Sequence, residues 1–155
     1  MKKLFIIFML FSLCLFSAYK TPTPTVTALV SSAQDLTTTW RVLGGQTNEL
    51  TTGSYDKIGT FFDIDINDSN DVRVRLTGAY TTGGNTFLLP IKTVGTSDVK
   101  IEDEYLEFNE DSDQRVFISW DIDRLIPFIY VEAQVSATGT TAAQIDDARY
   151  VLRWE

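Results

Sequence analysis

The chain has 155 residues and a formal net charge of −8 at pH 7, with no histidine and a single cysteine, Cys14. The absence of histidine excludes a Ser-His-Asp triad and an imidazole zinc site, and one cysteine allows neither an intrachain disulfide nor a thiolate zinc site. The acidic balance argues against nucleic acid as a partner, because the phosphate backbone is also negative, whereas oxygen-ligated calcium and carboxylate-only chemistry remain open.

The first 18 residues have the composition of a targeting segment. A basic start, MKK, precedes the apolar run LFIIFMLFSLCLF and the small residues SA. This order predicts a secretory signal peptide over residues 1–18, since a membrane-spanning helix needs about 20 apolar residues. An uncleaved N-terminal anchor is the alternative, and membrane contact is expected only through this segment. Residues 19–34 are predicted to be an extended Pro/Thr-rich linker with a short strand in TVTALVSS.

Residues 35–155 are predicted to form a single all-β domain, an antiparallel β-sandwich or jelly roll. Short segments with alternating polarity are separated by polar turns rich in Gly, Asn, Asp and Thr, and none has a helical period. This pattern is typical of antiparallel sheets that are buried on one face. The predicted strands lie in 25–32, 36–45, 57–66, 71–80, 86–94, 115–122, 127–137 and 148–155, with the short segments VKI (99–101) and YLEF (105–108) between the fifth and the sixth.

The alternation also predicts the core, because every second side chain of a strand points to the same face. Five stripes of apolar residues are expected inside. Their members are Ile58, Phe62, Ile64 and Ile66; Val72, Val74 and Leu76; Val116, Ile118, Trp120 and Ile122; Ile129, Val131, Ala133 and Val135; and Tyr150, Leu152 and Trp154.

The stretch FFDIDINDSNDVRVRL is predicted to be a hairpin with a loop at Asn67–Asp71. This register places Asp65 opposite Arg73 and Asp63 opposite Arg75, with an apolar opposite face. The turn-forming sequence NDSND fits such a loop, because Asn, Asp and Ser side chains bond to their own backbone.

A calcium loop is the alternative for this stretch. An EF-hand loop that started at Asp63 would need Gly at position 68 and Glu at position 74, and the chain has Asp and Val there. No metal site is therefore predicted on the strands. A weak calcium site at the loop tip, formed by Asp68, Asn70 and Asp71, stays open.

The acidic run IEDEYLEFNEDSDQ, residues 101–114, could supply a pair of carboxylates for glycoside hydrolysis. No surrounding motif singles out one pair, and a solvated acidic turn between two strands explains the run better. We therefore expect no catalytic residue, no cofactor and no enzymatic activity.

Four aromatic side chains alternate with the predicted core residues and are expected on the outer surface: Phe61, Phe117, Phe128 and Tyr130. An outward apolar row is typical of a contact with another copy of the chain or with another structural subunit. The same rings could instead form a platform for a glycan. Either use makes these four residues the candidate interaction site.

The segments TTTWRVLGG, FLLPIKT and IPFIYVEAQV, with the last before a Gly/Thr-rich turn, follow one another in an order that resembles small jelly-roll decoration proteins of tailed bacteriophage heads or tails. The resemblance covers roughly residues 35–155. It implies a non-enzymatic subunit that assembles on a virion surface.

One feature departs from that family, because a secretory signal is unusual on a protein that joins a particle in the cytoplasm. Two further hypotheses therefore remain: a secreted or surface-displayed carbohydrate-binding or adhesion module, and a subunit of an extracellular filament. The expected location is the virion if the gene belongs to a phage, and otherwise the cell surface or the medium.

Overall fold

The computed structural model describes residues 24–45, 49–53, 55–67, 71–89, 93–94, 99–101, 104–108, 114–123, 125–137 and 139–153. The predicted signal peptide or anchor at 1–18 lies outside these residues. The described strands are β1 (Thr27–Val30), β2 (Gln34–Asp35), β3 (Arg41–Val42), β4 (Leu50–Thr51), β5 (Lys57–Asp65), β6 (Val72–Ala79), β7 (Phe87–Leu88), β8 (Thr93–Val94), β9 (Val99–Ile101), β10 (Leu106–Phe108), β11 (Gln114–Asp121), β12 (Phe128–Val135) and β13 (Gln144–Arg153).

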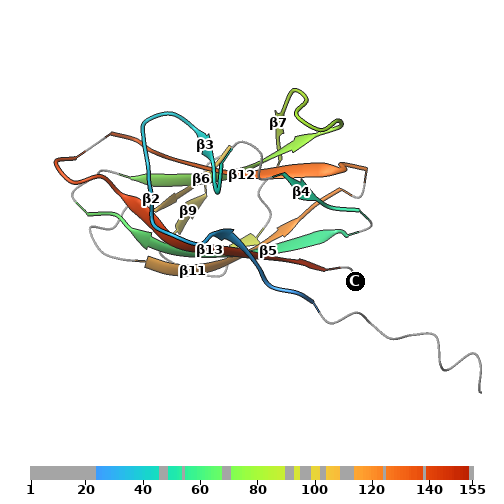
Figure 1. The fold of residues 1–155 in the computed structure, drawn as a ribbon, viewed down its shortest axis with the longest axis horizontal. Helices are drawn as coiled ribbons and strands as arrows, with labels where there is room; N and C mark the ends of the chain where they lie inside the picture. Colours follow the sequence, from blue (N-terminus) through green and yellow to red (C-terminus); the bar gives the residue numbers. More distant parts are fainter. Residues whose placement is uncertain are drawn as a thin grey trace, which may run out of the picture.

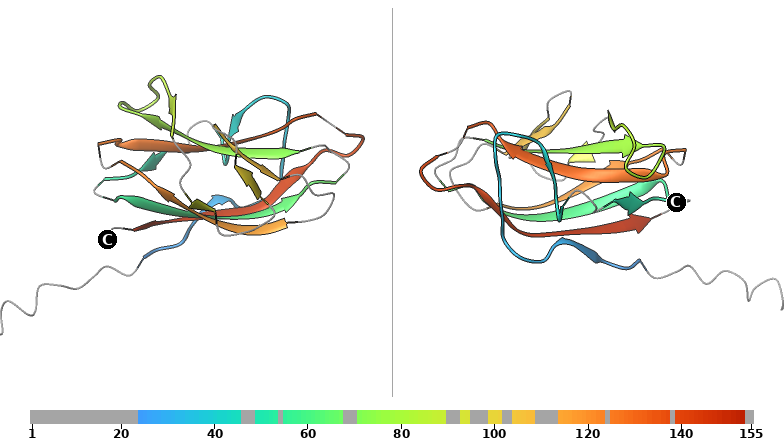
Figure 2. Two further views of the ribbon diagram at one scale, coloured as in Figure 1. Left: turned by 180° about the vertical axis from the view of Figure 1, so that it is seen from behind. Right: turned by 45° about the horizontal axis from the view of Figure 1, so that its top comes forward.

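These strands form two antiparallel sheets that pack face to face, which confirms the predicted β-sandwich (Figures 1 and 2). The first sheet has the order β1-β13-β5-β11-β8, and β2 also pairs with β13. The second sheet has the order β3-β12-β6-β10-β9, with β4 on β12 and β7 on β6. In the described part of the chain, no helix is long and apolar enough to cross a membrane.

The strand expected within 25–32 is β1. It lies at one edge of the first sheet, where Thr27 pairs with Tyr150 of β13. In Figure 1, β1 (blue) lies beside β13 (red), the last strand of the chain, so the first and last described strands belong to the same sheet.

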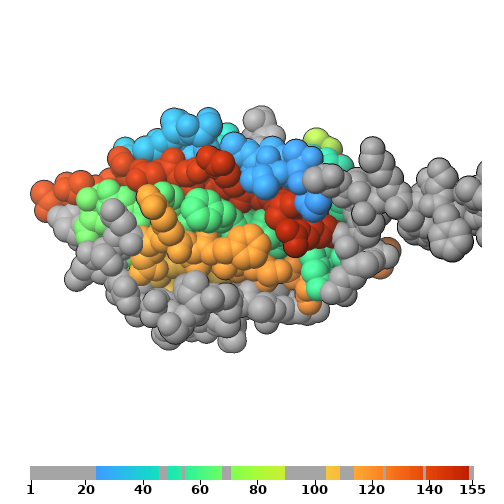
Figure 3. Space-filling view, turned by 90° about the horizontal axis from the view of Figure 1, so that it is seen from below, coloured from blue at the N-terminus to red at the C-terminus, as the bar shows by residue number. Residues whose placement is uncertain are grey.

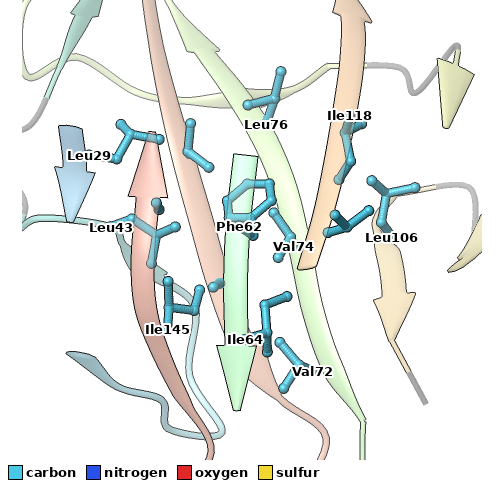
Figure 4. Packing of buried hydrophobic residues seen from close by; sticks show 14 of the residues in the cluster. Leu29, Leu43, Phe62, Ile64, Val72, Val74, Leu76, Leu106, Ile118 and Ile145 are labelled. Carbon is cyan, nitrogen blue, oxygen red and sulfur yellow. The ribbon is translucent and has the colours of Figure 1, made fainter. Parts of the chain in front are cut away.

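The core lies between the sheets and contains the predicted stripes of β5, β6, β11 and β12. Phe62 and Ile64 of the first sheet meet Val72 and Val74 of the second sheet in Figure 4, and all four are fully buried. Burial of a large apolar side chain contributes about 1.5–3 kcal/mol, so these stripes are the main source of stability.

The stripe of β13 is less regular than predicted. A register shift between Ile145 and Asp147 interrupts the alternation, and Ile145 and Ala148 are the fully buried residues of this strand. Tyr150 and Leu152 are half-buried and pack against the core. Trp154 lies outside the described residues.

The predicted hairpin between β5 and β6 is wrong. The two strands belong to different sheets, with β5 between β11 and β13, and β6 between β10 and β12. The chain therefore passes from the first sheet to the second between the end of β5 and the start of β6. The apolar stripes of β5 and β6 are nevertheless buried as predicted. They face each other across the core, whereas in a hairpin they would lie side by side on one face of a sheet.

The charge pairs expected across the hairpin are therefore also wrong. Arg73 pairs with Glu107 of β10 at 2.9 Å, and Arg75 pairs with Glu132 of β12 at 2.6 Å. On the first sheet, Asp63 pairs with Arg115 of β11, at 3.0 Å.

Candidate functional site

The four predicted surface aromatics lie on two opposite faces of the sandwich, so they do not form one platform. Phe61 of β5 and Phe117 of β11 are direct neighbours on the outer face of the first sheet. Phe128 and Tyr130 lie on β12, on the outer side of the second sheet, but Phe128 is half-buried and Tyr130 is buried, so neither is exposed as predicted. Each pair therefore belongs to a separate candidate site.

The first site is the Phe117 face, which we define as the outer surface formed by Phe61, Phe117, Gly59 and Val151. Figure 3 shows this side of the molecule, with β1 in blue, β13 in red, β5 in green and β11 in orange next to one another. Phe117 is 51 % exposed, whereas Val151 is almost fully buried although it points outward.

Gly59 explains how the Phe117 ring lies on the sheet. A Cβ atom at this position would come within 2.7 Å of the ring Cζ and 3.1 Å of Val151 Cγ1. The missing side chain thus leaves room for the ring to lie flat beside Val151. The result is an apolar centre that no described segment covers completely.

Two ion pairs lie beside this apolar centre on the same outer face. Asp63 pairs with Arg115 at 3.0 Å, and Asp147 pairs with Arg149 at 2.8 Å. These pairs are partly or largely exposed, so they contribute about 0–1 kcal/mol each to stability. An apolar centre with a polar rim is the usual composition of a protein–protein interface.

The second site is the Trp40 groove, a depression of about 540 Å³ on the outer side of the second sheet. It lies between the segment around β3 and the turn that follows β6, and strand β12 forms its floor. Its lining residues are Gln34, Trp40, Arg41, Val42, Gly45, Gly83, Gly84, Thr86, Tyr130 and Glu132.

Tyr130 forms part of the floor and fixes one wall of the groove. Its side chain is nearly buried, with 5 % exposed, and its hydroxyl donates a hydrogen bond of 2.5 Å to Glu49 Oε2. The same carboxylate oxygen accepts a hydrogen bond from the backbone N–H of Gly83 at 3.2 Å. Glu49 therefore ties the turn after β6 to the floor.

This hydrogen bond also changes the acidity of the tyrosine. Ionised Tyr130 could no longer donate to Glu49, and burial disfavours its charged form, so both effects raise the pKa of Tyr130 above its usual value. Tyr130 therefore acts at neutral pH as a fixed hydrogen-bond donor and not as a base.

Trp40 also lines the groove, and its ring contacts Arg75 and Tyr105. The guanidinium carbon of Arg75 lies 4.0 Å from the centroid of the Trp40 ring, and Arg75 Nε donates to Glu132 at 2.6 Å. The Tyr105 ring packs against Trp40, with 6.1 Å between the ring centroids. The guanidinium carbon of Arg73 lies in turn 4.8 Å from the centroid of the Tyr105 ring. These contacts fix the orientation of the indole ring.

Two of the acidic residues considered as candidate ligands or catalytic groups make contacts within the fold. Within the run 101–114, Glu107 is nearly buried and pairs with Arg73. Asp71, at the end of the predicted hairpin loop where a weak calcium site was the alternative, accepts a hydrogen bond from the Ser136 hydroxyl, and its carbonyl oxygen accepts one from the Ser136 backbone N–H. Asp68 and Asn70 lie outside the described residues. Among the described residues, no three His, Cys, Asp or Glu side chains are grouped closely enough to hold a metal ion.

Trp40, Glu49 and Glu132 were not predicted as site residues. Trp40 lies in LTTTWRVLGG, four residues before Gly44. The Gly44–Gly45 pair indicates a turn there, but the local sequence gives no other sign of a groove. No known protein family matches the sequence of this chain, and no curated protein has significant sequence similarity to it.

Proposed function

We propose that this protein is a non-enzymatic β-sandwich subunit that assembles with other copies of itself or with other structural subunits. The Phe117 face carries this proposal. Phe117 is about half exposed and lies beside charged residues, so a second protein surface that covered it would bury apolar area and stabilise the complex.

The use of the carboxylates supports a structural role. Glu107, Glu132, Asp63 and Asp147 each pair with an arginine of the same or a neighbouring strand. Carboxylates held in such pairs stabilise the surface of the sheets and are poorly placed to exchange protons with a substrate.

The resemblance of the strand pattern to phage decoration proteins supports the same role on a virion. Such proteins bind a particle surface through a sandwich domain, and here the Phe117 face is the surface that would be covered. If the gene is not from a phage, the corresponding proposal is a subunit exported to the cell surface or the medium.

Sedimentation equilibrium over a wide range of protein concentrations tests self-assembly. We expect the wild-type mass to rise with concentration and the Phe117→Ser variant to remain a monomer. Leu125→Ser is the matched control, since Leu125 is 79 % exposed and lies in the connection between β11 and β12, outside the Phe117 face. A wild-type protein that stays monomeric, or equal effects of both substitutions, would contradict self-assembly through this face.

A further inference from the structure

The Trp40 groove has the features of a prepared ligand site on the face opposite the Phe117 face. Its volume of about 540 Å³ lies within the range of about 300–1,000 Å³ that is common for small-molecule sites. Contacts within the chain hold two parts of its lining: Arg75 lies over the Trp40 ring, and Glu49 accepts a hydrogen bond from the backbone N–H of Gly83. A site that is already ordered loses little entropy when it binds.

The charges around the groove favour a neutral ligand. Glu132 is already paired with Arg75, and Arg41 adds a positive charge at one side. An anionic ligand would approach the carboxylates of Glu132 and Glu49. A cationic ligand on the Trp40 ring would approach Arg41 and the guanidinium that already lies on that ring.

The groups that line the groove are an indole ring with Arg75 over it, side chains that form hydrogen bonds and a glycine-rich rim. Gly45 and Gly83 both have left-handed backbones, with φ of 102° and 64°, and a Cβ atom at either would meet nothing within 4 Å. The rim is therefore low, and a ligand longer than the groove can extend beyond it. This combination fits a chain of sugar rings, which offers one apolar face and many hydroxyl groups.

We propose that the Trp40 groove binds a neutral oligosaccharide, with one sugar ring stacked on the face of the Trp40 ring opposite Arg75 and its hydroxyl groups bonded to Glu132 and Arg41. This site is independent of the assembly face, because the two lie on the outer sides of different sheets. The chain would then carry a glycan on one face and a structural partner on the other.

NMR titration of the labelled protein tests this proposal with four probes: cellohexaose, laminarihexaose, chitohexaose and mannohexaose. We expect at least one of them to shift the indole N–H resonance of Trp40 and to bind with a measurable Kd. The Trp40→Ala variant should lose at least tenfold in affinity, and Trp40→Phe should retain part of it because it keeps an aromatic ring. Phe117→Ser should bind as the wild type does.

Three results would overturn the proposal. These are the absence of a Trp40 shift with all four probes, an affinity that Trp40→Ala leaves unchanged in a folded variant, and tighter binding of an anionic hexamer of galacturonic acid than of the neutral probes. Because sedimentation measures assembly and the titration measures binding at Trp40, failure of the glycan site and failure of assembly are separate outcomes.

Discussion

Asn67, which follows β5, donates a hydrogen bond from its side-chain amide to the carbonyl oxygen of Ala142, just before β13, at 2.9 Å. Its backbone N–H donates to Asp65 Oδ1 at 3.1 Å, and its φ of 55° lies in the left-handed region. Among residues other than glycine, asparagine adopts this conformation most readily. Asn67 therefore combines a backbone role with a contact between distant segments.

Substitution of Asn67 separates these two roles. Asn67→Gly keeps the left-handed backbone and loses the bond to Ala142, which predicts a loss of about 0.5–1.5 kcal/mol in the free energy of unfolding. Asn67→Ala loses the same bond and also the short polar side chain that lets asparagine tolerate a left-handed backbone, so its loss should exceed that of Asn67→Gly by up to about 1–2 kcal/mol. Urea denaturation measures both, and an equal loss for the two variants would contradict the backbone role.

Gly59 and Phe117 are predicted to be energetically coupled. Gly59→Ala in the wild type places a methyl group within 2.7 Å of the Phe117 ring and forces it to move, which we expect to cost up to about 1 kcal/mol. In a Phe117→Ala background the same change should be neutral or should stabilise by about 0.5–1 kcal/mol, because glycine is unfavourable within a strand. The four variants form a double-mutant cycle, and a coupling energy of zero would show that the ring does not lie over Gly59.

Thr60 and Trp120 form a buried hydrogen bond that is predicted to contribute to stability. Trp120 is 1 % exposed, and its indole N–H donates to Thr60 Oγ1 at 2.8 Å. Thr60→Val leaves this N–H without an acceptor and should cost about 1–3 kcal/mol, whereas Trp120→Ala should cost about 3–5 kcal/mol through the cavity. Thr60→Ser keeps the hydroxyl group and is the control for Thr60→Val. A Thr60→Val loss no greater than the Thr60→Ser loss would show that the bond is unimportant.

Tyr130 makes stability depend on alkaline pH. Its pKa is higher in the folded chain than in the unfolded chain, first because of the bond to Glu49 and then because of burial. Folded protein thus retains a proton that unfolded protein releases, so the contribution is complete below a pH of about 10 and is lost as the pH rises through the raised pKa. At neutral pH, the free energy of unfolding of the wild type should exceed that of Tyr130→Phe by roughly 0.5–1.5 kcal/mol.

The difference between these two proteins should shrink when unfolding is measured above a pH of about 10. Comparison with Tyr130→Phe cancels the other groups that titrate in this range. A difference that is the same at neutral and alkaline pH would contradict the assignment. Absorbance titration of the phenols supplies an independent check on the order of their ionisation.

The sequence by itself determined which side chains are buried on most strands. The stripes through Phe62, Val74, Ile118 and Val131 lie in the core as the alternation predicts, because the pleat of a strand sends every second side chain to the same face. This is a local property, so a single sequence is enough to detect it. The same information predicted the β-sandwich.

Only the tertiary structure decided which strands are neighbours. β5 and β6 are adjacent in sequence and yet lie in different sheets, since their alternation specifies a buried face and says nothing about the hydrogen-bonded partner. The bulge in β13 also depends on that partner, because it moves Ile145 and Ala148 into the core and leaves Tyr150 at its margin.

The Trp40 groove illustrates the same limit for function. Trp40, Glu49, Gly83 and Tyr130 come from four separate segments, and long-range contacts bring them together. Aromatic residues that point outward could be recognised in the sequence, but it could not show that Phe117 and Tyr130 lie on opposite faces. That division depends on the order of strands in each sheet, which hydrogen bonds between distant parts of the chain determine.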